Sequence, residues 1–425
     1  MKQKLYSYIR ISIAVIVGIL TISAFVGIFY PVKIFNVQLT ALLQRTLVDF
    51  SLFAVILAAG LLVLTLLFGR IYCSTLCPLG LFQELLMLVF RRKITPQKGY
   101  VYKYFLAAVV FGVLIGGTVC LVRLVDPYTL FGSAATGSWL GLAFITALVV
   151  LVWFKGRFFC TNICPVGTVL GLISKHALNK IYIESDMCVS CGLCASKCPA
   201  GCIDFKNKTV DNETCIKCFK CLSGCRRSGV HYGIKPVPEP AFSPSRRRLL
   251  TGGLVLAAWA VAVKGGIELS KNVAVKAKKI LLPAGAGSAG EFANRCLNCN
   301  LCVQNCPMKI IKKADGEHST VYLDYMDSYC SFNCHKCSEV CPSGAISRLT
   351  LTEKRKTQIG VAHVNEEVCV QCGLCVMECP RQIIKKADGG YPQISPDECI
   401  GCGACKQVCP VKAITISAVE KQRIL

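Results

Sequence analysis

Four long uncharged segments dominate the first part of the chain. They cover residues 11–30, 50–69, 104–122 and roughly 132–154. Each has about the ~20 apolar residues that a helix needs to cross a bilayer. Four such segments in succession are more typical of membrane helices than of buried helices in a large soluble protein. The pattern therefore predicts a four-helix membrane domain over residues 1–180.

Basic residues predict how these spans are oriented. Lysine and arginine precede the first span and recur between the second and third, where Glu84 is the one acidic residue. The other two connections are poor in lysine and arginine. By the positive-inside rule, the amino terminus, the 70–103 connection and the chain after residue 154 face the cytoplasm. We expect a multi-pass protein of the cytoplasmic (inner) membrane.

A short signature follows the second span and returns after the fourth. GRIYCSTLCPLG occupies residues 69–80 and GRFFCTNICPVG residues 156–167. This duplication predicts two parallel repeats related by a pseudo-twofold axis along the membrane normal. The cysteines of each signature, Cys73 with Cys77 and Cys160 with Cys164, are four residues apart, which on a helix places both thiols on one face.

Three interpretations of these four cysteines remain open at the level of sequence. They bind a metal or an additional cluster, they relay electrons to or from quinone as dithiols, or they shape a helix entry together with Pro78 and Pro165. A structural disulfide is disfavoured on the reducing side of the membrane.

Cysteine spacing changes the picture from Cys188 onward. The chain has 30 cysteines, and six motifs of the type Cys-x2-Cys-x2-Cys-x3-Cys contain 24 of them. In bacterial ferredoxins three cysteines of such a run bind one [4Fe–4S] cluster and the fourth reaches the partner cluster. A zinc site needs only two Cys-x2-Cys pairs, and a disulfide framework has no reason to repeat one spacing. We predict six [4Fe–4S] clusters.

Exchange of the fourth cysteine within each pair of motifs predicts the ligands. One motif carries an extra residue between Cys330 and Cys334, and Cys225 is followed by arginine in place of proline. The predicted sets are Cys188, Cys191, Cys194 with Cys225; Cys215, Cys218, Cys221 with Cys198; Cys296, Cys299, Cys302 with Cys341; Cys330, Cys334, Cys337 with Cys306; Cys369, Cys372, Cys375 with Cys409; and Cys399, Cys402, Cys405 with Cys379.

These motifs divide the rest of the chain. We expect a two-cluster ferredoxin domain at 181–232, a proline-rich linker at 233–285, and ferredoxin units at 286–350 and 351–425. IIKKADG occurs at 310–316 and again at 383–389, and each copy predicts a short β-hairpin. The fold class is membrane α-helical with α+β ferredoxin domains of the bacterial 2[4Fe–4S] type.

The linker contains a further signal. SRRRLLTGG at 245–253 matches the twin-arginine pattern, and the uncharged run 249–263 has the length of a signal h-region. This favours export of the final four-cluster domain to the periplasm, with the first ferredoxin in the cytoplasm. An ordinary cytoplasmic linker, a cleaved segment and a retained fifth span are the alternatives.

Other function classes find little support. The formal charge of +24 comes without an aromatic-basic recognition motif, so we expect no nucleic-acid partner. We expect the basic residues to bind anionic lipid and to offset the negative charge of the clusters and their thiolates. No acid–base pair or nucleophile accompanies the clusters, and we predict no catalytic residue. None of the five histidines lies in a predicted span, so we expect no haem there. Cys120 and Cys202 are interpreted as packing residues.

At this point the motifs resemble two known families joined end to end. Residues 1–235 resemble the NapH-type quinol dehydrogenase membrane subunit, through the four spans, the two Cys-x3-Cys-Pro signatures and one ferredoxin. Residues 245–425 resemble its exported ferredoxin partner of the NapG type, through SRRRLL, LLPAGAGSAGEFANRCLNCNLCVQNCP and CSFNCHKCSEVCPSGA. The resemblance implies electron flow from quinol to a periplasmic reductase or cytochrome, with the chain as a quinol dehydrogenase component. The alternatives are a reductase for cofactor or metal-site assembly and cytoplasmic ferredoxin–quinone exchange.

Overall fold

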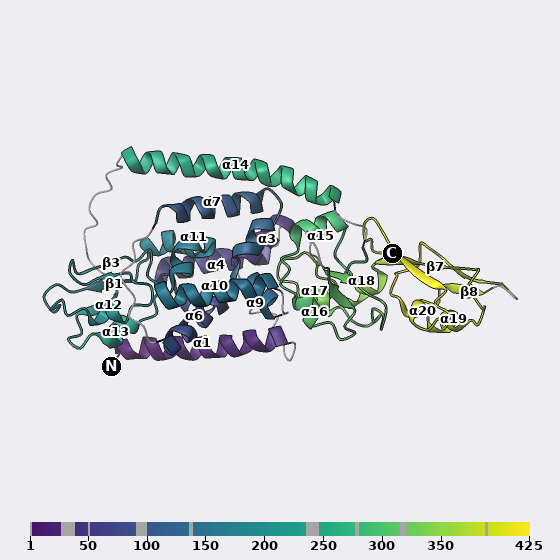
Figure 1. Cartoon of the computed structure of the whole chain (residues 1–425), viewed down its shortest axis with the longest axis horizontal. Helices are drawn as coiled ribbons and strands as arrows, with labels where there is room; N and C mark the ends of the chain where they lie inside the picture. Colours follow the sequence, from purple (N-terminus) through teal and green to yellow (C-terminus); the bar gives the residue numbers. More distant parts are fainter. Residues whose placement is uncertain are drawn as a thin grey trace. The chain divides into compact units, whose positions relative to one another are not determined.

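The computed structural model describes residues 2–26, 39–49, 52–90, 100–135, 139–234, 246–276, 280–314, 321–386 and 390–425. The chain divides into two compact units. Unit 1 holds residues up to 23 and 33–267, and unit 2 holds residues 24–32 and 268–425. Figure 1 labels the helices and strands of both units.

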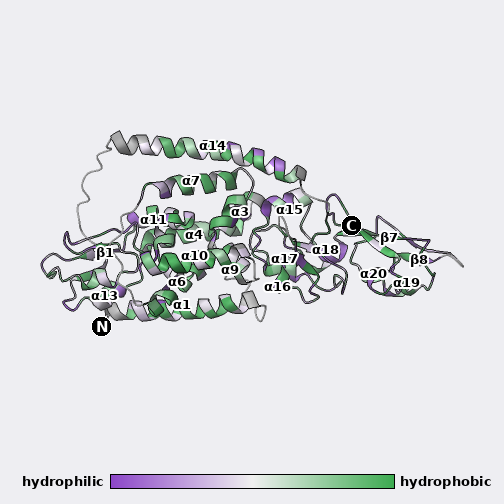
Figure 2. Ribbon diagram, in the orientation of Figure 1, coloured by the Kyte–Doolittle hydropathy of each residue, from purple (hydrophilic) through white to green (hydrophobic). Residues whose placement is uncertain are grey.

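Unit 1 contains a set of helices, a small ferredoxin domain and, after that domain, most of α14. Its helical part has α11 packed against both α4 and α7, while α10 packs against α6 and α9. Figure 2 shows that these helices are predominantly hydrophobic along their length. The helices are α1 (Lys2–Val26), α3 (Leu39–Asp49), α4 (Leu52–Phe68), α5 (Tyr72–Thr75), α6 (Pro78–Phe90), α7 (Tyr102–Ile115), α8 (Cys120–Val125), α9 (Pro127–Ala135), α10 (Trp139–Lys155), the π-helix η1 (Phe159–Ile163), α11 (Pro165–Lys175) and, shared with unit 2, α14 (Arg246–Lys276).

Helix lengths differ from the sequence prediction. Within the described residues, Leu5–Ser23 and Thr251–Ala274 are long and apolar enough to cross a membrane, and Leu52–Phe68, Pro78–Phe90, Tyr102–Ile115 and Gly141–Lys155 are shorter apolar helices. The 104–122 segment is not one helix, because α7 ends at Ile115 and α8 begins at Cys120. Gly117, with φ of 95°, lies between them. The apolar helix α6 lies in the stretch predicted as a plain cytoplasmic connection.

Helix α14 is longer than the predicted h-region and packs within unit 1. The helix continues from Arg246 to Lys276, so it extends well past the uncharged run. A Cβ added to Gly116, the residue that caps the C-terminus of α7, would lie 2.7 Å from the Cα of Gly266, and one added to Gly112 within α7 would lie 2.8 Å from the Cβ of Ala262. Small residues thus bring the two helix backbones into contact, which is the packing that membrane helices favour.

The ferredoxin domain of unit 1 is α+β. Strand β1 (Lys180–Ile183) pairs antiparallel with β4 (Val230–Gly233), placing Ile181 opposite Tyr232. Strand β2 (Ile203–Asp204) pairs with β3 (Thr209–Val210), and the short helices α12 (Leu193–Ser196) and α13 (Lys220–Gly224) pack together. Each sheet is a two-stranded ribbon, and the buried residues Ile181, Phe219 and Val230 belong to the same hydrophobic cluster as residues of the helices.

Unit 2 repeats this plan. The hairpins β5–β6 and β8–β9 confirm the two predicted from IIKKADG, although their turns lie outside the described residues. Strands β7 and β10 pair antiparallel. The elements are α15 (Ala289–Arg295), α16 (Leu301–Gln304), β5 (Ile311–Lys313), β6 (Val321–Leu323), α17 (Lys336–Val340), α18 (Leu351–Lys356), β7 (Gly360–Val364), α19 (Leu374–Glu378), β8 (Ile384–Lys386), β9 (Pro392–Ile394), α20 (Ala404–Gln407) and β10 (Ile414–Ala418).

Candidate functional site

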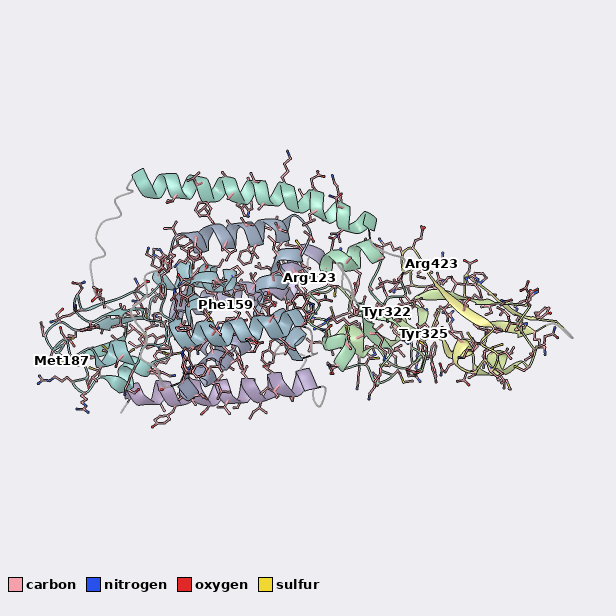
Figure 3. All side chains as sticks on the ribbon, in the orientation of Figure 1. Arg123, Phe159, Met187, Tyr322, Tyr325 and Arg423 are labelled. Atoms are coloured by element: carbon pink, nitrogen blue, oxygen red, sulfur yellow. The ribbon has the colours of Figure 1, made fainter. Side chains whose placement is uncertain are left out.

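The two Cys-x3-Cys-Pro signatures form compact turns. Cys73 lies in α5 and Cys160 in η1, beside the buried Phe159 that Figure 3 labels. Cys77 and Cys164 come after those helices, and Cys164 has an extended backbone with ψ of 119°. The prediction that both thiols of a signature share one helix face is therefore wrong. A residue before proline is pushed out of the helical region, so the chain leaves the helix between the two cysteines.

Two arginines tie the signatures together reciprocally. Arg157 Nη1 donates to the carbonyl oxygen of Cys73 at 3.1 Å, and Arg70 Nη2 donates to the carbonyl oxygen of Cys160 at 2.8 Å. The side chains of Arg70 and Arg157 are 1% and 0% exposed. Each arginine belongs to one signature and binds the other. This exchange is the contact that two repeats related by a pseudo-twofold axis would make.

A glycine closes each signature for a steric reason. A Cβ added to Gly80 would lie 2.2 Å from the carbonyl oxygen of Cys73, and one added to Gly167 would lie 2.3 Å from that of Cys160. The Gly167 N–H also donates to Cys164 Sγ at 3.4 Å, which makes Cys164 the N-cap of α11. Proline at the first helical position and glycine at the third thus turn the cysteine sulfur toward backbone N–H groups.

The four signature thiols are buried and interact with one another. Cys77 lies within electrostatic reach of Cys73, Cys160 and Cys164, and all four are free cysteines in the hydrophobic core. Burial raises the pKa of the Cys77 thiol and raises that of Cys160 to about 11. Among the described residues, no group of three His, Cys, Asp or Glu side chains is arranged to hold a single metal ion.

The ferredoxin domain of unit 1 is docked directly on the signatures. Arg70 Nη1 donates to the carbonyl oxygen of Glu213 at 3.0 Å, and the backbone N–H of Arg157 donates to that of Pro199 at 3.1 Å. One continuous hydrophobic core contains the four signature cysteines together with Cys194, Cys198, Cys202, Cys215, Cys218 and Cys221.

Cysteines from paired motifs come together in this domain. Cys194 interacts electrostatically with Cys188 and Cys225. Cys221 interacts with Cys218, Cys215 and Cys198, and least with Cys194 of the other set. The first group joins cysteines of the first motif to Cys225 of the second, and the other group joins cysteines of the second motif to Cys198 of the first. Two [4Fe–4S] clusters with exchanged fourth ligands require this arrangement.

The same grouping recurs in unit 2. Cys302 interacts electrostatically with Cys296, Cys299 and Cys341. The remaining groups are Cys337 with Cys330, Cys334 and Cys306; Cys405 with Cys402, Cys399, Cys379 and, least, Cys375; and Cys375 with Cys372 and Cys369. Cys409 accepts a hydrogen bond from the Ala413 N–H at 3.3 Å. These neighbours include the cysteines of the predicted ligand sets, and thiolate ligands of this kind are what iron–sulfur clusters use.

Tyr325 is a buried residue near the cysteines of unit 2 that the sequence pattern did not indicate. It is 3% exposed, and its hydroxyl donates to the carbonyl oxygen of Gly401 at 3.0 Å. Figure 3 labels it in unit 2. Tyr325 lies near Cys330 and Cys402, and the Cys330 N–H donates to the Cys402 carbonyl at 2.8 Å. The ring therefore packs where the two ferredoxin units of unit 2 meet, a contact between segments too distant in sequence to be predicted.

Cys202 contacts other cysteine sulfurs, which is a more specific position than the packing role predicted for it. Its Sγ lies 3.5 Å from that of Cys198 and also contacts Cys215, and the side chain is buried. Ala345 and Ala413 occupy the corresponding position, four residues after the last cysteine, in two other motifs. With Cys198 and Cys215 as cluster thiolates, the Cys202 thiol would be the hydrogen-bond donor to them.

Replacing Cys202 with alanine should lower the reduction potential of one cluster by about 20–60 mV, because one hydrogen bond of about 0.5–1.5 kcal/mol to the ligand sulfurs is lost. An EPR-monitored redox titration of the purified chain measures the shift, with Cys120→Ala as the control. A decrease in iron content would instead identify Cys202 as a ligand, and an unchanged potential would leave it as packing.

Several protein-family models match the chain. A 4Fe-4S binding domain matches residues 50–97 and 138–183, and another matches 181–204. 4Fe-4S dicluster domains match residues 211–310, 295–345, 330–383 and 362–416. The chain therefore binds 4Fe–4S clusters through multiple domains.

Curated relatives cover part of the chain. The methylamine utilization ferredoxin-type protein MauM of Methylorubrum extorquens is 35% identical over 153 residues, which is 32% of this chain and 68% of MauM. The ferredoxin-type protein NapG of Escherichia coli is 32% identical over 148 residues, 32% of this chain and 63% of NapG. The putative electron transport protein YccM of Escherichia coli is 25% identical over 167 residues, 35% of this chain and 46% of YccM. The chain spans about two thirds or less of the length of these relatives.

Proposed function

This chain belongs to the family of ferredoxin-type 4Fe–4S proteins that includes MauM, and we propose that it carries electrons from membrane quinol to a periplasmic reductase or cytochrome. Electron transfer through iron–sulfur clusters is the activity of the family. The membrane anchoring, the quinol donor and the periplasmic acceptor belong to the proposal.

The proposed route has six clusters, held by the six ligand sets predicted from the exchange of fourth cysteines. The electrostatic groups around Cys194, Cys221, Cys302, Cys337 and Cys405 support that assignment, because each draws on both motifs of a pair. Each cluster supplies one-electron chemistry when bound. The chain's own residues bury the cysteines and hold them in sets.

The observation that carries the proposal is the shared core of unit 1. The signature cysteines among the apolar helices and the cysteines of the docked ferredoxin belong to one hydrophobic cluster. Because electron tunnelling weakens steeply with distance, a ferredoxin packed directly on apolar helices is suited to exchange electrons with a carrier dissolved in lipid. A ferredoxin on a mobile tether would lack that proximity.

Helix α14 supports the route to the other side of the membrane. Its segment Thr251–Ala274 is long enough to span a bilayer, and its contact with α7 through Gly112, Gly116 and Gly266 favours a retained helix over a cleaved signal. A retained span after a cytoplasmic ferredoxin would deliver unit 2 to the periplasm. The side chains of the three arginines at its start lie outside the described residues.

Right-side-out and inside-out membrane vesicles test donor, acceptor side and topology together. After reduction of the clusters by a lipid-soluble quinol, an impermeant oxidant added outside should reoxidise the clusters of unit 2 in right-side-out vesicles only. EPR spectra recorded on freezing report the cluster oxidation state.

Two results would contradict the proposal. Clusters that dithionite reduces but quinol does not would favour an assembly reductase. Reoxidation by the impermeant oxidant in inside-out vesicles only would place unit 2 in the cytoplasm and favour ferredoxin–quinone exchange.

A further inference from the structure

Unit 1 contains two buried cationic side chains beside the four signature thiols, and their charge is not balanced within the described residues. Arg70 is 1% exposed, yet none of the ion pairs in the described part of the chain includes it. Its hydrogen-bond acceptors are the carbonyl oxygens of Glu213 and Cys160 and, at 3.8 Å, Cys73 Sγ. A buried guanidinium paired only with neutral groups is strongly unfavourable.

The second arginine does not relieve this imbalance. Arg157 is 0% exposed and lies 2.9 Å from Glu84, but the same carboxylate also pairs with Arg10 and Lys220. Three cations therefore share one anion, and Arg70 has none. The region needs additional negative charge.

From these observations we propose that Cys73, Cys77, Cys160 and Cys164 together hold one further [4Fe–4S] cluster, shared between the two repeats of unit 1. Four thiols lose their protons when they bind such a cluster. The oxidised cluster with its four thiolates would carry two negative charges, which would offset the buried charges of Arg70 and Arg157. This site adds to the six predicted clusters and stands independently of quinol as the donor.

Unpartnered hydrogen-bond donors point to the same site. Arg70 Nε, Arg157 Nε and Gln83 Nε2 are buried without a partner. Gln83 Oε1 lies 3.4 Å from Cys160 Sγ. Amide oxygen and nitrogen are interchangeable by rotation, so with Cys160 as a thiolate the Gln83 amide would turn its N–H toward the sulfur. N–H groups directed at sulfur are the usual surroundings of iron–sulfur clusters.

Backbone donors add two equivalent contacts. The N–H of Gly167 donates to Cys164 Sγ, and that of Gly80 donates to Cys77. Both come from the first turn of helices of more than ten residues, α11 and α6. The partial positive charge at a helix start favours a thiolate over a thiol. The two repeats thus present the same donor to the second cysteine of each signature.

Ligand number excludes the simpler arrangements. The 4Fe-4S binding-domain model matches 50–97 and 138–183 separately, and each of these segments contains only two cysteines. A cubane cluster with full thiolate ligation needs four, so both segments must contribute. A single ion requires thiolates in closer mutual contact than a cluster does, and the described residues form no such group.

Iron content of the anaerobically purified full-length chain tests the proposal. Seven clusters give 28 iron atoms per chain and six give 24, so the expected value is near 28. Cys73→Ser and Cys160→Ser should each lose about four irons and the same Mössbauer component, while Cys120→Ser should lose none.

The wild-type measurement remains decisive if a variant does not fold. A value near 24 irons in the wild-type chain, or one zinc in place of the extra irons, would overturn the proposal. So would a full iron complement in folded Cys73→Ser protein. None of these outcomes depends on electron transfer from quinol, so the proposed function can fail while the site stands.

Discussion

Replacing Gly167 with alanine is expected to destabilise unit 1 by about 2.5–6 kcal/mol. The new Cβ would lie 2.3 Å from the Cys160 carbonyl oxygen and 2.8 Å from Arg70 Nη2. Overpacking of this kind costs about 1–3 kcal/mol, and loss of the hydrogen bond from Arg70 adds about 1.5–3 kcal/mol. Denaturant unfolding in detergent micelles, followed by circular dichroism, measures the effect. Gly80→Ala should behave alike, because its Cβ meets the Cys73 carbonyl oxygen at 2.2 Å.

The matched control is Gly60→Ala in α4. A Cβ at Gly60 has no atom within 4 Å, and alanine is favoured over glycine inside a helix by roughly 0.5–1 kcal/mol. This variant should be as stable as the wild type or slightly more stable. If Gly167→Ala unfolds at the same denaturant concentration as Gly60→Ala, the close approach at the signature is not essential to unit 1.

Local cysteine patterns were the most predictable part of the molecule. Three cysteines of a motif lie within seven or eight residues, so the chain can bring them to one cluster without any distant contact. The hairpins β5–β6 and β8–β9 were predictable for the same reason. The repeat of the Gly-Arg-x-x-Cys-x3-Cys-Pro signature indicated two related halves, and the exchange between Arg70 and Arg157 agrees with that relation.

Features that depend on contacts between distant segments were not predictable. An apolar run fixes hydrophobicity but not helix ends: α7 stops at Ile115 and α14 continues past its first lysine to Lys276. Tyr325 meets Gly401 only because two ferredoxin units pack together. The error on the signature cysteines was avoidable, because the proline after each pair already disfavours a continuous helix.

Removing the charge of Glu84 should destabilise unit 1 by about 3–5 kcal/mol, the range typical of breaking a buried ion pair. Its carboxylate forms ion pairs with Arg10 at 2.7 Å, Arg157 at 2.9 Å and Lys220 at 2.9 Å. These cations come from α1, from the second signature and from the ferredoxin helix α13. Glu84→Gln would leave three partly or fully buried cations facing a neutral amide. The ferredoxin should then undock, which limited proteolysis between residues 176 and 234 detects together with a lower unfolding midpoint.

Two further variants separate charge from shape at this position. Glu268→Gln on α14 removes an exposed carboxylate whose one ion pair among the described residues is with Lys271 at 3.8 Å, so its effect should be near zero. Glu84→Asp keeps the charge on a shorter side chain and should recover part of the stability. Equal unfolding midpoints for Glu84→Gln and Glu268→Gln would contradict the ion network as the link between ferredoxin and helices. A Glu84→Gln chain with a lower unfolding midpoint but an unchanged proteolysis pattern would mean that the carboxylate stabilises only the helices. The contacts of Arg70 with Glu213 and of Arg157 with Pro199 would then be enough to hold the ferredoxin in place.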